Sequence, residues 1–187
     1  MDKTFADTLE LVDDRLRLRP WRSDDAPWLV EAVRESIASV GQWLPWCHAN
    51  YGPDDARAWI ADCQSGWQSG KLFAFPIFDA HSGMLLGSIG LNQLNAKHRS
   101  ANLGYWIRQT CQGHGFAPAA VRLVAKFGFE RLGLTRIEII VLPENLPSRR
   151  TAEKSGASFE GMARNRLWIG EQAHQAAVYS LIQADLC

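Results

Sequence analysis

A glycine-rich turn between an expected strand and a long expected helix constrains this chain more than any other feature. The turn reads Gln112-Gly113-His114-Gly115-Phe116-Ala117. Glycine lets the backbone approach a ligand closely, and the first N–H groups of a helix have no partner within that helix. Together with the helix dipole, these amides suit a pyrophosphate. The turn alone is a weak signal, because a glycine-rich turn can also simply start a helix.

The rest of the chain predicts a mixed α/β sheet covered by helices. Charged and apolar residues alternate over 15–20, as in a half-buried strand, and Ser23 is expected to cap a helix that runs to about Ile37. The other expected elements are a helix over about 53–69, strands over about 72–79, 84–92 and 101–108, a helix over about 116–132 ended by Gly133, a strand over 136–142, a helix from about Asn145, and strands over about 158–169 and 172–183. This order places strand ends beside a helix start, where we expect a ligand crevice.

Length and composition exclude several classes of protein. The 187 residues predict a single domain, 1–187, which can bury a core without a metal or disulfide. Lys plus Arg equals Asp plus Glu at 20 each, which removes the usual electrostatic reason to propose nucleic-acid binding. Residues 1–14 are acidic and lack the apolar core of a signal peptide, and no window resembles a membrane span. We therefore expect a cytoplasmic protein with neither a nucleic-acid nor a membrane partner.

The cysteines are far apart in the sequence and form no CxxC pair. They are Cys47, Cys63, Cys111 and Cys187. This usage is typical of free thiols in a reducing compartment, and no metal site is expected.

Several further segments match the pattern of one family in the right order. They are Arg15-Leu16-Arg17-Leu18-Arg19-Pro20 with Asp24-Asp25-Ala26, Trp43-Leu44-Pro45-Trp46, Leu86-Gly87-Ser88-Ile89-Gly90-Leu91, Leu103-Gly104-Tyr105-Trp106-Ile107, and Asn145-x-x-Ser148 followed by Glu153 to Gly161. With the glycine-rich turn, they make the chain similar to the GCN5-related N-acetyltransferase (GNAT) superfamily, specifically its RimJ/RimL-type ribosomal-protein branch. The resemblance covers about residues 11–183.

The resemblance implies a fold and a donor substrate. The implied GNAT fold has a central, mostly antiparallel seven-stranded sheet with one splayed parallel pair, flanked by about four helices. Acetyl-CoA is implied to lie between the strands that end at Arg108 and Leu142. The implied donor contacts are Trp106, Ile107 and Arg108 for the pantetheine, Gln112, Gly113, His114, Gly115, Phe116 and Ala117 for the pyrophosphate, and Asn145 for the cofactor arm.

The resemblance also implies direct attack of an amine on the thioester. Ser148 matches the family serine that interacts with the sulfur of coenzyme A, although it also lies in the first turn of a helix capped by Asn145. Two positions depart from the family. Ala152 stands where many members have an acid tyrosine, and Arg166 stands at or near the glutamate base of the ribosomal branch. Glu160 is interpreted as structural, so no base is named; a water chain to a carboxylate such as Glu35 stays open.

The acceptor remains open among three hypotheses. A weak base suits a protein α-amine, whose pKa is near 8, better than a lysine near 10.4, which favours a protein N-terminus, possibly ribosomal. Trp43 and Trp46 flank a proline and are expected, together with Glu35, on the acceptor side, although burial in the core is the default for tryptophan. The alternatives are a small amine, such as an aminoglycoside or polyamine, and an acyl-CoA-binding module without turnover. The protein is expected to be a monomer or homodimer.

Overall fold

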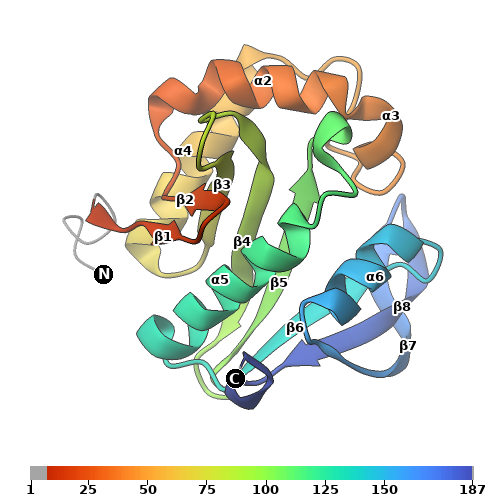
Figure 1. The fold of residues 1–187 in the computed structure, drawn as a ribbon. Coiled ribbons are helices and arrows are strands. Elements are labelled where there is room, and N and C mark those ends of the chain that lie inside the picture. The colour runs from red at the N-terminus through yellow and green to blue at the C-terminus, as the bar shows by residue number, and fades with distance from the viewer. Residues whose placement is uncertain (1–7, 187) are drawn as a thin grey trace.

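An eight-stranded sheet runs through the computed structural model, which describes residues 8–186 (Figure 1). The strands, in sheet order, are β1 (Leu11–Val12), β2 (Leu16–Leu18), β3 (Phe73–Asp79), β4 (Leu85–Asn95), β5 (Ser100–Ile107), β6 (Arg136–Val141), β8 (Gln172–Leu181) and β7 (Ser158–Ile169). The expected mostly antiparallel sheet is confirmed, but with eight strands instead of seven, because the two residues of β1 are too few to show alternation. Residues 1–7, part of the segment judged unlike a signal peptide, and Cys187 lie outside the described residues.

Five α-helices flank the sheet within residues 8–186, one more than about four. They are α2 (Ala26–Glu35), α3 (Ile37–Val40), α4 (Pro53–Ser69), α5 (Phe116–Leu132) and α6 (Leu146–Lys154). The extra helix arises because the expected first helix breaks at Ser36, whose hydroxyl donates to the carbonyl of Ala32 (2.6 Å). The predicted Ser23 cap is wrong: residues 23–25 form a 3₁₀ turn, and α2 starts after Asp25.

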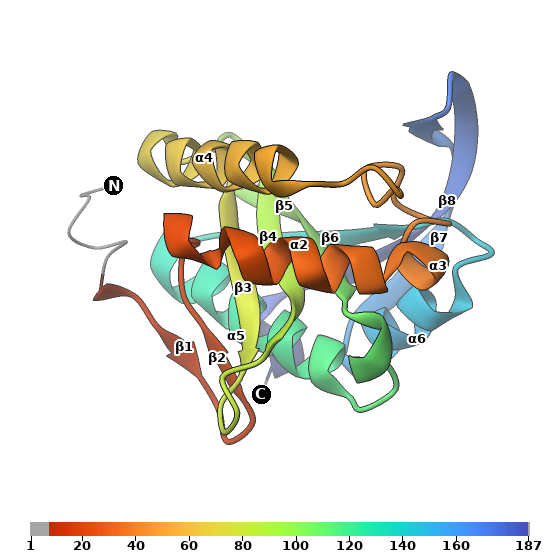
Figure 2. The same ribbon diagram turned by 90° about the horizontal axis from the view of Figure 1, so that it is seen from above.

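The helices form two layers on opposite faces of the sheet (Figure 2). Helix α4 lies on one face, α5 and α6 lie on the other, and α2 crosses the end of the sheet. One apolar cluster joins the sheet to α5 and α6, and a second lies beneath α2 and α4. No helix within residues 8–186 combines the length and apolar character needed to cross a bilayer.

The long helix α5 has the bounds that the sequence predicts, and glycine explains both ends. Gly115 precedes the helix with φ of 79°, and Gly133 follows it with φ of 66°. Both values lie in the left-handed region that side chains with a Cβ rarely adopt. The two glycines therefore fix where α5 starts and stops.

Strands β5 and β6 form the parallel pair, and they stay together for only three residue pairs. The pairing runs from Ser100 opposite Arg136 to Asn102 opposite Glu138. Beyond this point β5 continues through residues 103–107, which still pair with β4 on their other side. The two strands thus diverge into a V that opens toward the start of α5, which confirms the expected splay.

Candidate active site

The loop between β5 and α5 presents main-chain donors at the open end of the V. Gly113 and Gly115 adopt φ of 82° and 79°, where glycine is favoured. A Cβ at Gly113 would meet nothing within 4 Å, so conformation and not crowding requires glycine there. Since the first N–H groups of a helix lack intrahelical acceptors, Phe116 and Ala117 direct their amides out of the helix end. The arrangement suits an anion.

Two side-chain contacts brace this loop. The Gln112 Nε2 group donates to the carbonyl of Ile107 (2.9 Å) and to Ser39 Oγ (3.2 Å), which ties the loop to the end of β5. Arg15 immediately precedes β2. Its guanidinium donates to the carbonyl of His114 (2.7 Å) and lies over the ring of Phe116, with its Cζ 4.6 Å from the ring centroid. The His114 side chain is exposed, and its main chain carries the contact.

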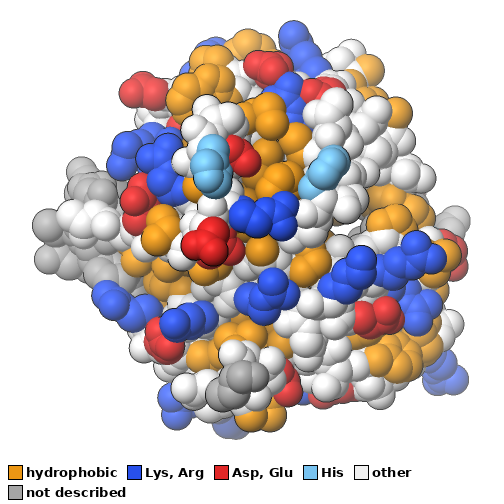
Figure 3. Space-filling view, viewed as in Figure 1, with side chains coloured by type: hydrophobic (Ala, Val, Ile, Leu, Met, Phe, Trp, Pro, Cys, Tyr) orange, Lys and Arg blue, Asp and Glu red, His pale blue; other side chains and the backbone are white. Residues whose placement is uncertain are grey.

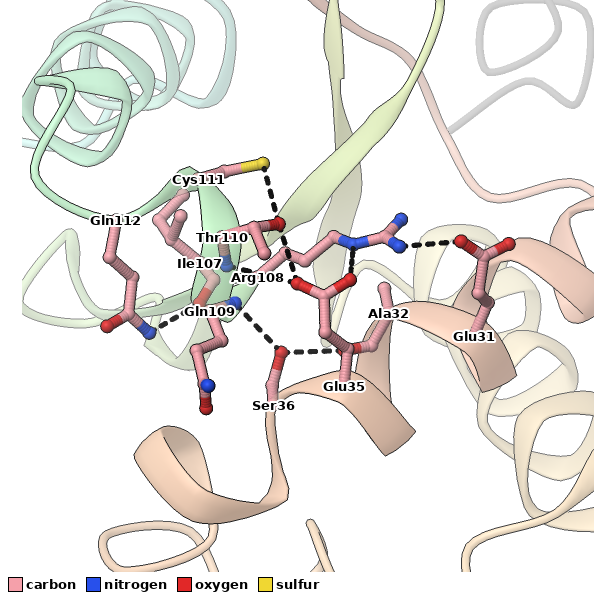
Figure 4. Close-up of polar contacts among 10 residues, drawn as sticks. All are labelled: Glu31, Ala32, Glu35, Ser36, Ile107, Arg108, Gln109, Thr110, Cys111 and Gln112. Atoms are coloured by element: carbon pink, nitrogen blue, oxygen red, sulfur yellow. Dashed lines mark hydrogen bonds and ion pairs between the residues drawn. The ribbon is translucent and has the colours of Figure 1, made fainter.

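A cluster of hydrogen bonds fastens the same loop to α2, and Figure 4 shows it in close-up. Arg108 Nε donates to Glu35 Oε2 (2.5 Å), and the amide and hydroxyl of Thr110 donate to Glu35 Oε1 (3.0 and 2.6 Å). Arg108 also donates to Glu31 (2.5 Å). We call Glu31, Glu35, Arg108 and Thr110 the α2 clasp. It joins α2 to the loop that precedes α5.

The α2 clasp occupies both oxygens of Glu35. Burial raises the pKa of Glu35, but the hydrogen bonds from Thr110 and Arg108 outweigh it and bring the pKa below its usual value. A carboxylate with a lowered pKa that accepts three hydrogen bonds is a poor proton acceptor at neutral pH. The geometry gives Glu35 a role in holding the loop.

Glu35→Gln tests this role of the α2 clasp. An amide at this position turns a donor toward Arg108, so we expect the acetyl-CoA KM to rise several-fold while kcat changes by less than about tenfold. Loss of a general base costs about 10²–10⁴-fold in rate. Steady-state kinetics across pH separate the two cases. A kcat loss above a hundredfold together with loss of the acidic limb of the pH profile contradicts the holding role.

Ser148 lies in the first turn of α6, and contacts from both sides fix it. Asn145 Oδ1 accepts from the Ser148 amide (3.1 Å), as expected of an N-cap. Tyr105, on the diverging part of β5, places its hydroxyl 2.9 Å from the Ser148 carbonyl and 3.0 Å from Ser148 Oγ. Sequence reasoning used Tyr105 only as part of a motif. The position of Tyr105 near the middle of the strand that lines the V could have identified it as a candidate site residue.

The face of the sheet opposite α5 carries a network of ion pairs. Ile137 and Ile139 of β6 pack into the α5 cluster, so Arg136 and Glu138 lie on the opposite face. Glu138 pairs with Arg136 (3.0 Å) and with Arg166 (3.3 Å). Arg166, which stands at or near the position of the family glutamate, is thus an ion-pair partner of Glu138 here.

Glu160 belongs to the same network. Hydrogen bonds from Arg136 and Ser180 lower the pKa of Glu160 to about 2. Its carboxylate contacts Arg136 through both oxygens. This ion-paired placement agrees with the structural interpretation of Glu160. Ala152, at the position of the family tyrosine, is fully buried.

The tryptophans expected on the acceptor side lie beside the V. Trp46 is 40% exposed and packs edge-on against Trp106 of β5, with 5.7 Å between ring centroids. Trp106 is itself buried, so its side chain belongs to the cluster beneath α2 and α4. Trp43 is half-buried in the same segment. Trp46 and Trp106 form an aromatic wall on the face opposite α5.

Basic side chains cross the face that carries α5 and α6. Figure 3 shows them as a band over these helices, with the surface hollowed between the start of α5 and α6. Arg122 and Lys126 of α5 and Arg150 of α6 have exposed side chains. The net charge of the chain is zero, so this positive band is local.

The three cysteines in the described part of the chain are free thiols. Cys47, Cys63 and Cys111 are buried and unpaired. No group of three or more His, Cys, Asp or Glu side chains within residues 8–186 is arranged to hold a metal ion.

The splayed parallel pair and the helix start bounded by glycine agree with an acetyl-CoA-dependent acyltransferase, and the family comparison shows that class. The chain belongs to the acetyltransferase (GNAT) domain family, whose model matches residues 15–158. It is 30% identical over 182 residues to YdaF of Bacillus subtilis (strain 168), which carries the provisional name ribosomal N-acetyltransferase; the match covers 93% of this chain and 94% of YdaF.

Two further comparisons bear on the acceptor. A solved structure from Vibrio cholerae, provisionally named a ribosomal-protein-serine acetyltransferase, superposes with a TM-score of 0.83 at 32% identity over 94% of this chain and 98% of that one. The spermidine N(1)-acetyltransferase of Escherichia coli (strain K12) is 31% identical over 101 residues, which is 54% of each chain.

Proposed function

We propose that the protein transfers the acetyl group of acetyl-CoA to the N-terminal α-amine of a protein, with a ribosomal protein as the leading acceptor. In this proposal the amides of Gly113 to Ala117 bind the pyrophosphate. The main chain of Trp106, Ile107 and Arg108 pairs with the pantetheine along the diverging part of β5, and Asn145 contacts the cofactor arm. The V and the glycine conformations both fit this anionic, extended donor.

Direct attack requires the amine and the thioester to be held together while charge on the carbonyl oxygen and the sulfur is stabilised. A main-chain N–H of β5 at the divergence is suited to the oxyanion. The Ser148 hydroxyl, in the first turn of α6 and in contact with Tyr105 of β5, is suited to donate to the sulfur as it gains charge. The acceptor then approaches from the opposite face, along the aromatic wall of Trp46 and Trp106.

The choice of a protein N-terminus as acceptor rests on the ion pairs that the carboxylates near this wall already make with arginines. Glu138 and Glu160 are both engaged by arginines, and Glu35 by Arg108. A polycation such as spermidine needs carboxylates that are free to receive its ammonium groups, and each of these three already pairs with an arginine. A protein N-terminus brings one amine that is partly neutral at pH 7 and needs no acidic wall.

Polyamine acetylation is the second candidate, favoured by the relative that acts on spermidine. Thiol release from acetyl-CoA separates the two. We expect turnover with peptides that copy ribosomal-protein N-termini, none with the same peptides carrying a blocked α-amine and a free lysine, and little with spermidine. Turnover on spermidine that exceeds turnover on every free N-terminal peptide overturns the protein acceptor.

Ser148→Ala probes the proposed sulfur contact. The substitution removes the hydroxyl but keeps the amide bonded to Asn145 and the carbonyl bonded to Tyr105. We expect kcat to fall about tenfold to a hundredfold, while calorimetry gives an acetyl-CoA Kd within about threefold of the parent. A parallel loss of turnover and affinity would point to a purely structural serine.

A further inference from the structure

The side chain of Tyr105 crosses the V on its α6 side. Tyr105 lies in residues 103–107 of β5, beyond the last pair with β6, yet its hydroxyl contacts α6, which follows β6 in the chain. The phenol is therefore a direct side-chain link between the two halves that diverge at the V. Its hydroxyl contacts both the carbonyl and the hydroxyl of Ser148, and the Thr151 side chain also forms a hydrogen bond with it.

The hydrogens of this contact can be assigned from chemistry. A carbonyl oxygen only accepts, so the Tyr105 hydroxyl donates to the Ser148 carbonyl, and its oxygen is left to accept from the Ser148 hydroxyl. Serine and threonine in helices commonly donate instead to a carbonyl of the preceding turn, as Thr151 does to Pro147 (3.0 Å). Tyr105 gives the Ser148 hydroxyl a partner outside its own helix.

We infer that Tyr105 is a positioning residue that aims the Ser148 hydroxyl into the V and strengthens it as a donor; this inference rests on the proposed role of Ser148. As charge develops on the sulfur, the Ser148 O–H turns to it and the Tyr105 O–H turns to Ser148 Oγ. Two hydroxyl rotations accomplish this, and no bond to hydrogen breaks. A hydroxyl that accepts one hydrogen bond donates the next one more strongly.

The environment of Tyr105 keeps its proton in place. Burial raises the pKa of Tyr105 to about 12, against the lowering effect of the hydrogen bonds with Ser148 and Thr151. The phenol thus remains a donor throughout the neutral and mildly alkaline range in which an α-amine reacts. Acting through Ser148, it need not touch the donor or the acceptor.

Tyr105→Phe removes the hydroxyl and keeps the ring. We expect kcat to fall about fivefold to thirtyfold with the acetyl-CoA Kd within about threefold of the parent. The double variant Tyr105→Phe, Ser148→Ala should turn over no more slowly than Ser148→Ala alone, because Tyr105 acts only through Ser148. Tyr179→Phe is the matched control: its buried hydroxyl also bonds to α6, through Arg149 and Glu153, but not to Ser148.

The outcomes separate the inference from the proposal beneath it. If Ser148→Ala lowers kcat and Tyr105→Phe does not, the positioning role is overturned and the role of Ser148 stands. If the two losses multiply in the double variant, or if Tyr179→Phe reproduces the loss of Tyr105→Phe, Tyr105 does not act through Ser148. If Ser148→Ala turns over like the parent, the proposed role of Ser148 falls first, and the inference falls with it.

Discussion

Gly115→Asp is expected to weaken acetyl-CoA binding between about tenfold and a hundredfold in calorimetry. A carboxylate about 6 Å from a phosphate opposes it by about 2.8 kcal/mol per charge pair at an effective dielectric constant near 20. Arg15 Nη1 lies 3.8 Å from the position of the new Cβ and offsets part of this repulsion. Turnover at subsaturating donor should fall in proportion.

Gly115→Asn is the matched control for that experiment. Asparagine and aspartate have the same shape, and both tolerate the positive φ of 79° better than other side chains do. Only the charge differs, so the asparagine variant should bind acetyl-CoA within a few-fold of the parent. Equal affinities for the two variants would show that no phosphate lies at the start of α5.

Asp25→Ala is expected to destabilise the fold by about 3–5 kcal/mol, because it leaves a buried arginine without its partner. The side chains of Arg19 and Asp25 are 9% and 1% exposed and meet through two hydrogen bonds of 2.8 and 2.7 Å. Asp25 also accepts from the Arg22 amide (2.8 Å). For a domain of this size the melting temperature should drop by about 10 °C or more.

Replacing both partners of this pair distinguishes a buried unpaired charge from a general packing defect. Arg19→Met with Asp25→Leu removes both charges, and replacing a buried ion pair by apolar side chains is often nearly neutral. The double variant still loses the acceptor for the Arg22 amide, a cost of about 1 kcal/mol. Urea unfolding should therefore find it more stable than Asp25→Ala. A double variant that is less stable than the single one would refute the unpaired-charge explanation.

The sequence predicts the parts of this fold that depend on local conformation. The bounds of α5 follow from Gly115 and Gly133, and the strand from Ser158 to Ile169 follows from its own pattern and the turn after it. The break at Ser36 was missed, because a hydroxyl that bonds its own helix carbonyl leaves no mark on the apolar periodicity.

The sequence does not predict contacts between residues that come together only in the folded chain. The alternation of Arg15 to Pro20 predicts a half-buried strand, but it gives no sign that Arg19 lies inside with Asp25. Tyr105 and Ser148 are 43 positions apart and meet because β5 and β6 diverge at one point of the sheet. The pairing of Arg166 with Glu138 likewise depends on the strand order β6-β8-β7.

The brief pairing of β5 with β6 leaves two rows of peptide groups facing each other across a widening wedge. A sheet closes such a gap only if another extended strip of amides fills it, and pantetheine, with its two amides, is a strip of that kind. Pantetheine bound in this way would be recognised by peptide groups of the protein and not by its side chains. Under the proposed function, exposed side chains that pack against β5, such as Trp46, are then left to determine which amine is received.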